Sequence, residues 1–229
     1  MNIIGAQIAK EYFRKRGESN VFEAVSPCDI SLLPGTLTIL CGKSGSGKST
    51  LLNMLSGMLR PTHGSVEYDG ADLYAMPDDA LSRFRNRNIG YIPQGRSMAP
   101  AWNVLENVMM PLTLYGERDE DRAMELMARL SIDGLRDMKM SRLSGGELKR
   151  VAIARALIRN PAAVFADEPT GDLDEENTQT VFRMLKDMAR EGKTVLAVTH
   201  DQDAAVYADR VLTMESGKCF VQASADAEP

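Results

Sequence analysis

Residues 42–49 read Gly-Lys-Ser-Gly-Ser-Gly-Lys-Ser and match the pattern G-x-x-x-x-G-K-[ST] of nucleotide phosphate-binding loops. Glycine has no Cβ atom, so the three glycines let the backbone adopt left-handed dihedrals and bring its N–H groups against phosphate oxygens. Lys48 is expected to place its ammonium group on the β- and γ-phosphates, and Ser49 to offer its hydroxyl to Mg²⁺. The rest of the expected phosphate-binding set is Gly42, Ser44, Gly45, Ser46, Gly47 and Thr50.

The stretches on both sides of this loop have the pattern expected around a phosphate site. Thr36–Cys41 is apolar and β-branched and predicts a buried strand. Apolar residues from Leu51 to Leu59 recur with helical spacing until Arg60-Pro61. A strand, a glycine loop and a helix N-terminus form an anion site, because free N–H groups and the helix dipole both point at the ligand. A glycine-rich turn that resembles the motif by chance is the alternative, and these flanks argue against it.

The composition sets broad bounds on function. The chain has 229 residues and a formal net charge of −5, without a long run of Lys and Arg, so nucleic-acid binding through a basic face is not indicated. Apolar stretches such as Thr194–Val198 are far shorter than the roughly 20 residues of a membrane span, and residues 1–16 lack a signal-peptide pattern. Cys28, Cys41 and Cys219 lack metal-ligand spacing and predict reduced, mostly buried thiols of a cytoplasmic protein.

The rest of the chain alternates between apolar strands and amphipathic helices. The expected strands are Ala163–Ala166, Thr194–Thr199 and Arg210–Met214, and the expected helices are Arg122–Leu130, Glu147–Arg159 and Glu175–Arg190. This alternation predicts an α/β fold with a mostly parallel sheet covered on both faces. Between about residues 96 and 142 the strand pattern vanishes, which indicates an inserted helical lobe in a single domain of residues 1–229. Residues 223–229 are expected to be a disordered tail.

A second chemical cluster follows the apolar run that starts at Ala163. Asp167 ends this run, so its carboxylate is expected at the carboxyl edge of the sheet, where it can hold Mg²⁺ opposite Ser49. Glu168 comes next and can orient and deprotonate the water that attacks the γ-phosphate. A strand that ends in a solvated acidic turn is the alternative, and the phosphate loop in the same chain argues against it.

A rarer string lies at residues 143–147, which read Leu-Ser-Gly-Gly-Glu. Together with the phosphate loop and the Asp167-Glu168 pair, it makes residues 10–218 resemble the ATP-binding subunit of ABC (ATP-binding cassette) transporters. The resemblance implies a P-loop NTPase core of the RecA-like type, with an antiparallel β subdomain and an inserted α-helical lobe. In that family the string is the signature motif, so Ser144, Gly145 and Gly146 are expected to contact the γ-phosphate bound on a partner subunit. The family usually has Gln where this chain has Glu147.

The resemblance also assigns roles to single residues outside these motifs. Gln94 matches the glutamine that contacts Mg²⁺ and the attacking water, and His200 matches the histidine that contacts the γ-phosphate. Asp174 matches the aspartate that links the two sites across the dimer. Tyr12 lies where the family places an aromatic ring on adenine, with the adjacent Phe13 as the alternative.

The implied assembly is a head-to-tail homodimer around two ATP molecules with Mg²⁺, attached to a transmembrane permease on the inner, cytoplasmic face of the membrane. Residues 166–171, Ala-Asp-Glu-Pro-Thr-Gly, and residues 104–108 resemble the group of lipoprotein-release, macrolide-export, antimicrobial-peptide-resistance and cell-division cassettes. Lys43 and Pro93 depart from the usual pattern of that group. Two interpretations stay open for Trp102, Val104, Met109 and Met110: they fill the core, or they line a groove that receives a short helix from a membrane partner.

Two other classes remain as alternatives. One is a non-transport ABC ATPase of DNA repair or translation, and the other is a regulatory cassette, for instance in cell division, that acts as an interaction module. The repair proteins insert a long coiled coil between phosphate loop and signature, and the translation proteins fuse two cassettes; neither feature is present here. Glu168 and His200 are both intact, which argues against a catalytically silent cassette.

Overall fold

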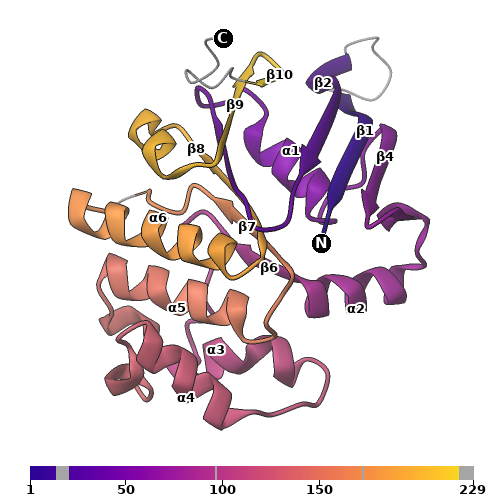
Figure 1. Ribbon diagram of the computed structural model, residues 1–229. Helices are drawn as coiled ribbons and strands as arrows, with labels where there is room; N and C mark the ends of the chain where they lie inside the picture. Colours follow the sequence, from indigo (N-terminus) through magenta and orange to yellow (C-terminus); the bar gives the residue numbers. More distant parts are fainter. Residues whose placement is uncertain (14–20, 96, 172, 222–229) are drawn as a thin grey trace.

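The computed structural model of the chain describes residues 1–13, 21–95, 97–171 and 173–221 (Figure 1). The expected tail at residues 223–229 therefore lies outside the described residues. Within them, one sheet has six strands in the order β10-β9-β3-β8-β7-β6. The strands are β3 (Leu37–Cys41), β6 (Ile89–Ile92), β7 (Ala163–Asp167), β8 (Thr194–Thr199), β9 (Arg210–Glu215) and β10 (Lys218–Val221). All neighbours are parallel except the edge pair of β9 and β10.

The central strands are continuous apolar runs because both faces of the parallel sheet are covered. Every residue of β3, β7 and β8 is buried. The predicted α/β class and mostly parallel sheet are confirmed, and the three strands after residue 160 are found within one residue of their predicted bounds.

A second, antiparallel sheet has the order β2-β1-β4-β5. Its strands are β1 (Ile3–Phe13), β2 (Val21–Leu32), β4 (His63–Tyr68) and β5 (Ala71–Asp72). Helix α1 (Lys48–Leu55) packs between the two sheets, since one buried cluster contains Ile3 and Val25 of the antiparallel sheet, Leu52 of the helix and Leu196 of the parallel sheet. The end of β1 and the start of β2 thereby lie close to the N-terminus of α1.

The helical lobe lies in the lower part of Figure 1. Its helices are α3 (Val104–Thr113), α4 (Glu120–Arg129) and α5 (Gly145–Leu157), while α2 (Asp78–Asn88) precedes β6 and α6 (Glu175–Arg190) covers the sheet. Short 3-10 segments are η1 (Leu73–Ala75), η2 (Asp133–Leu135), η3 (Met140–Arg142) and η4 (Gln202–Tyr207). No helix in the described part of the chain is long and apolar enough to cross a membrane.

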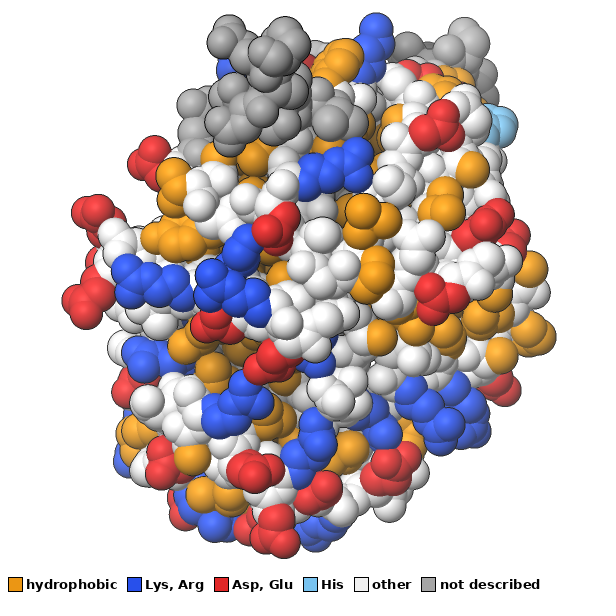
Figure 2. Space-filling view, in the orientation of Figure 1, with side chains coloured by type: hydrophobic (Ala, Val, Ile, Leu, Met, Phe, Trp, Pro, Cys, Tyr) orange, Lys and Arg blue, Asp and Glu red, His pale blue; other side chains and the backbone are white. Residues whose placement is uncertain are grey.

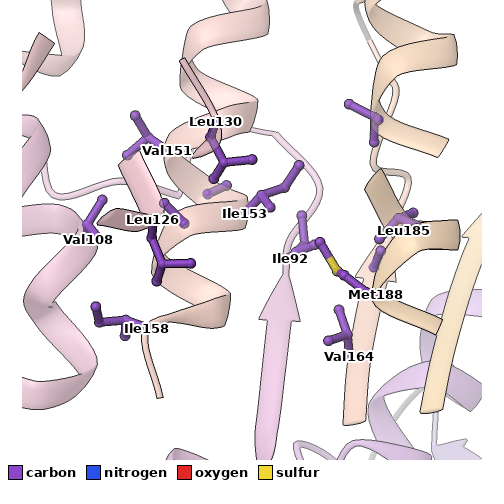
Figure 3. Packing of buried hydrophobic residues seen from close by; sticks show 14 of the residues in the cluster. Ile92, Val108, Leu126, Leu130, Val151, Ile153, Ile158, Val164, Leu185 and Met188 are labelled. Carbon is purple, nitrogen blue, oxygen red and sulfur yellow. The ribbon is translucent and has the colours of Figure 1, made fainter. Parts of the chain in front are cut away.

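The lobe shares one hydrophobic core with the parallel sheet. Figure 3 shows Val108, Leu126 and Val151 on the lobe side of this core, and Val164 and Leu185 on the side of the sheet and α6. Helix α5 lies between the two groups, so it is buried over much of its surface. The N-terminus of α5 is consequently held in a fixed position relative to the sheet.

Some helix bounds differ from the predicted ones for local reasons. The helix after the phosphate loop ends at Leu55 instead of continuing toward Leu59, because Gly57 adopts a φ of +74° and the N–H groups of Met58 and Leu59 both donate to the carbonyl of Asn53. Helix α5 begins two residues before the predicted start because Ser144 caps it. Helix α6 has the predicted bounds, Glu175–Arg190.

The three cysteines are free thiols in this fold. Cys28 and Cys41 are buried and Cys219 is partly buried. Burial raises the pKa of Cys28 to about 12 and also raises the pKa of Cys41 and Cys219. Because the thiolate is the nucleophile, these thiols are expected to react slowly with alkylating reagents near neutral pH.

Candidate active site

The carboxyl ends of β3, β7 and β8 meet at one edge of the parallel sheet, since the three strands are parallel neighbours. A pocket of about 580 Å³ opens at this edge. Its lining contains these sequence-predicted residues: Tyr12, Ser44, Gly45, Gly47, Lys48, Ser49, Thr50, Gln94, Glu168 and His200. The fold therefore gathers the phosphate loop, the acidic strand end and residues from three further segments around a single cavity.

Two glycines of the phosphate loop are required by close backbone contacts. A Cβ atom on Gly47, whose φ is +107°, would lie 2.3 Å from the carbonyl oxygen of Ala24. A Cβ atom on Gly42 would lie 2.3 Å from the carbonyl oxygen of Met214. Both distances are too short for any other residue type, so the curvature of the loop depends on these positions.

Lys48 is the first residue of α1 and is buried under the loop. Its Nζ atom donates hydrogen bonds to the carbonyl oxygens of Gly42 and Lys43, at 2.8 and 3.1 Å, and lies 3.7 Å from Oε1 of Glu168. The ammonium group is thus held where the loop and the strand end meet. Ser46 is buried and is not part of the pocket lining, and its Oγ atom has no hydrogen-bond partner in the described structure.

The oxygen ligands expected for Mg²⁺ lie together. Oγ of Ser49 donates to Oδ1 of Asp167 at 2.8 Å, and Gln94 lines the same pocket. The described residues hold no group of three or more His, Cys, Asp or Glu side chains able to bind a metal alone. Mg²⁺ is commonly bound by one or two carboxylates together with phosphates and water, so this donor set fits it.

Asp167 carries a charge that the fold disfavours. Burial raises the pKa of Asp167 above its usual range, and the hydrogen bond from Ser49 opposes that shift. The folded pKa then exceeds the unfolded value, so the ionised carboxylate destabilises the ligand-free protein at neutral pH. This cost is fully present above the folded pKa and is lost as the pH falls through it.

We therefore expect Asp167→Asn to raise the melting temperature of the ligand-free protein while it impairs Mg²⁺-dependent ATP binding. Each kcal/mol gained corresponds to about 2–4 °C for a domain of this size. Differential scanning calorimetry with EDTA at pH 7 measures the effect, and Asp137→Asn, at a carboxylate that is 80% exposed, is the matched control. If Asp167→Asn has a lower melting temperature than the wild type in the absence of ligand, the destabilising effect assigned to the ionised Asp167 carboxylate is contradicted.

Glu168 is positioned for proton transfer by three contacts. Its backbone N–H donates to the carbonyl of Val198 at 3.0 Å, Oε2 lies 2.9 Å from Nδ1 of His200, and Oε1 faces Lys48. Its φ of +44° is a left-handed conformation that a residue with a side chain adopts only at a cost of about 1–3 kcal/mol. A buried carboxylate in a strained turn, aimed into the phosphate pocket, has the geometry of a general base.

An aromatic pair forms part of the pocket wall. Tyr12 on β1 and Phe22 on β2 are cross-strand neighbours, and both line the pocket. Phe13 is 72% exposed and is not part of the lining, so the structure places Tyr12 rather than Phe13 at the cavity. Phe22 and Ala24 were missed by the sequence analysis, although the apolar Val21-Phe22 pair that starts β2 is a signal for a strand.

The signature residues do not reach this pocket within the same chain. Ser144 caps α5 and forms a capping box with Glu147: its N–H and Oγ donate to Oε2 of Glu147 at 2.7 and 2.8 Å. These bonds lower the pKa of Glu147. Ser144 and Gly145 are exposed at the N-terminus of α5. A helix N-terminus can bind an anion, but this one is not part of the phosphate pocket of its own chain.

Asp174 lies at the N-terminus of α6, beside the signature. Its carboxylate caps this helix by accepting the N–H of Asn177 at 2.8 Å, which lowers the pKa of Asp174. A Cβ atom on Gly146 would lie 2.8 Å from Oδ1 of Asn177, so the N-termini of α5 and α6 adjoin. Asp174 and the signature thus form one exposed surface, separate from the phosphate pocket.

The structure decides between the core and groove interpretations of Trp102, Val104, Met109 and Met110 residue by residue. Val104 and Met109 are buried in the core that α3 shares with α5, because the apolar face of α3 turns toward that helix. Of the four predicted residues, Met110 lines a groove, about 480 Å³ in volume, between α2, β6 and the ends of α3 and α5. Trp102 is 37% exposed and lies outside its lining.

A phosphate loop, an Asp-Glu pair at the carboxyl edge of a parallel sheet and a lobe that ends in a capped, exposed helix define the class of cassette-type P-loop ATPases. A family model described as ABC transporter matches residues 25–171. The chain belongs to the ABC transporter family and is an ABC ATPase that binds ATP.

Relatives of known name agree with this assignment. The chain is 38% identical over 222 residues to the lipoprotein-releasing system ATP-binding protein LolD of Leptospira interrogans, covering 95% of this chain and 92% of that protein. It is 40% identical over 204 residues to the macrolide export ATP-binding/permease protein MacB of Chlorobaculum tepidum, covering 88% of this chain. The match spans 31% of the length of that MacB protein.

Solved structures have the same fold. The bacterial ABC transporter cassette MJ0796, solved as a dimer, superposes with a TM-score of 0.86 at 33% identity, covering 96% of this chain and 97% of that chain. A dimeric post-hydrolysis state of MJ0796 bound to ADP and Pi gives a TM-score of 0.87 at 31% identity, covering 97% and 99%.

Proposed function

We propose that the chain hydrolyses ATP as a head-to-tail homodimer in which each pocket is completed by the signature of the other copy. The observation that carries this proposal is the separation of the two halves of the site. Lys48, Glu168 and His200 share one cavity, whereas Ser144 is exposed at a helix N-terminus outside it. A second copy turned end to end brings the missing anion site to the γ-phosphate. That the similar cassette MJ0796 was solved as a dimer supports an assembly of two copies.

The geometry of the pocket supports the following residue roles. Lys48 and the loop N–H groups bind the β- and γ-phosphates, and Tyr12 stacks on adenine. Ser49, Asp167 and Gln94 would hold Mg²⁺, which when bound neutralises charge on the phosphate oxygens. Glu168 takes the proton of the attacking water.

His200 and Asp174 complete the assignment at the two ends of the site. His200 orients Glu168 through the 2.9 Å contact and approaches the γ-phosphate. Asp174 lies on the same surface as the signature and couples the two sites across the dimer interface.

We further propose that the ATPase drives a transmembrane permease. The relatives are named for lipoprotein release and macrolide export, which favours export or extraction of a lipid-linked or apolar substrate. The groove beside Met110 is the docking surface for a cytoplasmic segment of that permease. This places the subunit in the cytoplasm, peripheral on the inner face of the membrane.

The proposed nucleotide site is tested by Lys48→Ala. We expect loss of ATP-dependent thermal stabilisation and of phosphate release, because the variant lacks the ammonium group aimed into the phosphate loop. Lys43→Ala removes the same charge from an exposed position of the loop and is the control expected to retain most of both signals. Unchanged ATP binding and turnover in a folded Lys48→Ala protein would refute the site.

A further inference from the structure

Tyr91 on β6 lies beside Asp167, the carboxylate expected to hold Mg²⁺. Strands β6 and β7 are parallel neighbours, and Tyr91 is paired with Phe165 in their register. Asp167 follows Phe165 by two residues, so the side chains of all three residues lie on the same face of the sheet. On this face Tyr91 packs against the buried cluster that contains Phe165 and Leu52 of α1. Tyr91 and the acidic end of β7 are therefore neighbours under α1.

The Tyr91 hydroxyl contacts two polar side chains. Its Oη atom donates to Oδ1 of Asn53 on α1 at 2.8 Å, and it also forms a hydrogen bond with the carboxylate of Asp167. Asn53 follows Ser49 by four residues, so both lie on the same face of α1, and Ser49 donates to Oδ1 of Asp167. The Asp167 carboxylate is thus held by hydroxyl groups from two different elements, α1 and β6.

The Tyr91 hydroxyl can serve as a donor to Asp167 when the carboxylate is charged. A phenol is protonated near neutral pH and carries a single proton, for which Asn53 and Asp167 compete. When the amide of Asn53 turns over, its N–H group donates to Tyr91, and the phenol proton is available to Asp167. Asn53 then supports the contact between Tyr91 and Asp167.

We propose that Tyr91 is a positioning residue for Mg²⁺ binding, whose hydroxyl donates to the Asp167 carboxylate and, together with Ser49, fixes its orientation for the metal ion. Groups that hydrogen-bond to metal ligands orient them, and their loss typically lowers metal affinity by about 10–100-fold. The inference rests on the proposed role of Asp167 as a Mg²⁺ ligand. The alternative is that Tyr91 only anchors β6 to α1 through Asn53, which affects stability but not metal binding.

The surface of the protein leaves a metal-binding measurement easy to interpret. The described residues hold no group of three or more His, Cys, Asp or Glu side chains able to bind a metal ion alone. On the face seen in Figure 2, acidic side chains are interspersed with basic ones. Metal binding that depends on nucleotide therefore reports on the phosphate pocket.

The inference is tested with Tyr91→Phe in the whole chain. Electron paramagnetic resonance measures the Kd of Mn²⁺ in the presence of the non-hydrolysable analogue AMP-PNP, and calorimetry measures the Kd of AMP-PNP in EDTA. We expect the Mn²⁺ affinity to fall by about tenfold or more, because the Asp167 carboxylate loses a hydrogen bond that orients it. The affinity for metal-free AMP-PNP should stay at the wild-type value, since Lys48 and the phosphate loop are unchanged.

Tyr68→Phe is the matched control. Tyr68 is buried, and its hydroxyl donates to the carbonyl oxygen of Leu55, at the end of α1 opposite to Ser49, at 2.7 Å. This variant also removes a phenol hydroxyl that is anchored to α1. It should lower the melting temperature and leave the Mn²⁺ affinity unchanged.

Asp167→Asn in the same assay separates two ways of failing. If Asp167→Asn binds Mn²⁺ like the wild type, the proposed role of Asp167 is wrong and the inference fails with it. If Asp167→Asn loses Mn²⁺ affinity whereas a folded Tyr91→Phe protein keeps it, the inference is overturned and the role of Asp167 stands. If Tyr91→Phe is unstable, 4-fluorophenylalanine at position 91 fills the same space without a donor and is judged by the same outcomes.

Discussion

Glu168→Gln is expected to lower ATP turnover by about 10²–10⁴-fold and to trap the protein as an ATP-bound dimer. Glutamine keeps the size of the side chain and an oxygen within reach of His200, but it cannot accept the proton of the attacking water. Binding and interface closure depend on Lys48 and on the partner's signature, so they remain intact. We therefore expect this variant to lose ATP turnover while it keeps ATP-dependent dimerisation.

Phosphate release and size-exclusion chromatography with ATP and Mg²⁺ measure the two effects. Glu125→Gln neutralises an exposed carboxylate on α4 and is the matched control, which should hydrolyse ATP like the wild type. Normal hydrolysis by Glu168→Gln would mean that another group activates the water. If Glu168→Gln instead stays a monomer in the presence of ATP, nucleotide binding does not close the dimer interface.

Mixed dimers of Lys48→Ala and Ser144→Arg subunits should recover hydrolysis that both parent homodimers lack. Lys48→Ala destroys the phosphate site of its own subunit, whereas Ser144→Arg destroys the signature that a subunit contributes to the site of its partner. In the mixed dimer one site contains both defects, and the other combines an intact Lys48 with an intact Ser144. The amount recovered depends on how strongly Asp174 couples the two sites.

The mixture is best made with fused subunits or with the permease present, since isolated cassettes can associate weakly. Cysteines introduced at the exposed Ser44 and Ser144 provide an independent test, because only a head-to-tail dimer brings these two positions together. An ATP-dependent intersubunit cross-link is the expected result. Its absence, together with inactive mixed dimers, would exclude the proposed interface.

Local chemistry in the sequence was sufficient to predict the phosphate loop and the strands of the parallel core. The loop spacing, the Asp167-Glu168 strand end and the apolar runs of β7 and β8 each depend on neighbours within a few residues. The same holds for α6, whose start and end are set by its cap at Asp174 and by Gly192 beyond its C-terminus. The helix predicted at Arg122–Leu130 is found as α4, whose apolar residues Ala123, Leu126 and Met127 are buried together with Leu130 at its C-terminal end.

The tertiary structure alone decided how distant segments meet. Phe22 reaches the nucleotide pocket because β2 pairs with β1 beside Tyr12, a contact that depends on strand register. Val104 and Met109 have the composition of a docking surface, yet they are buried because α5 packs against α3. The local sequence could not distinguish a buried helix face from a docking surface, because both are apolar.

The sequence by itself thus determined which chemistry the chain carries: a phosphate loop, an acidic strand end and a capped signature helix. The tertiary structure decided that the first two share one cavity while Ser144 lies outside it, and that Val104 and Met109 are buried whereas Met110 lines a groove. The physical reason is that spacing along the chain fixes local geometry, whereas burial and charge pairing depend on which distant elements pack together.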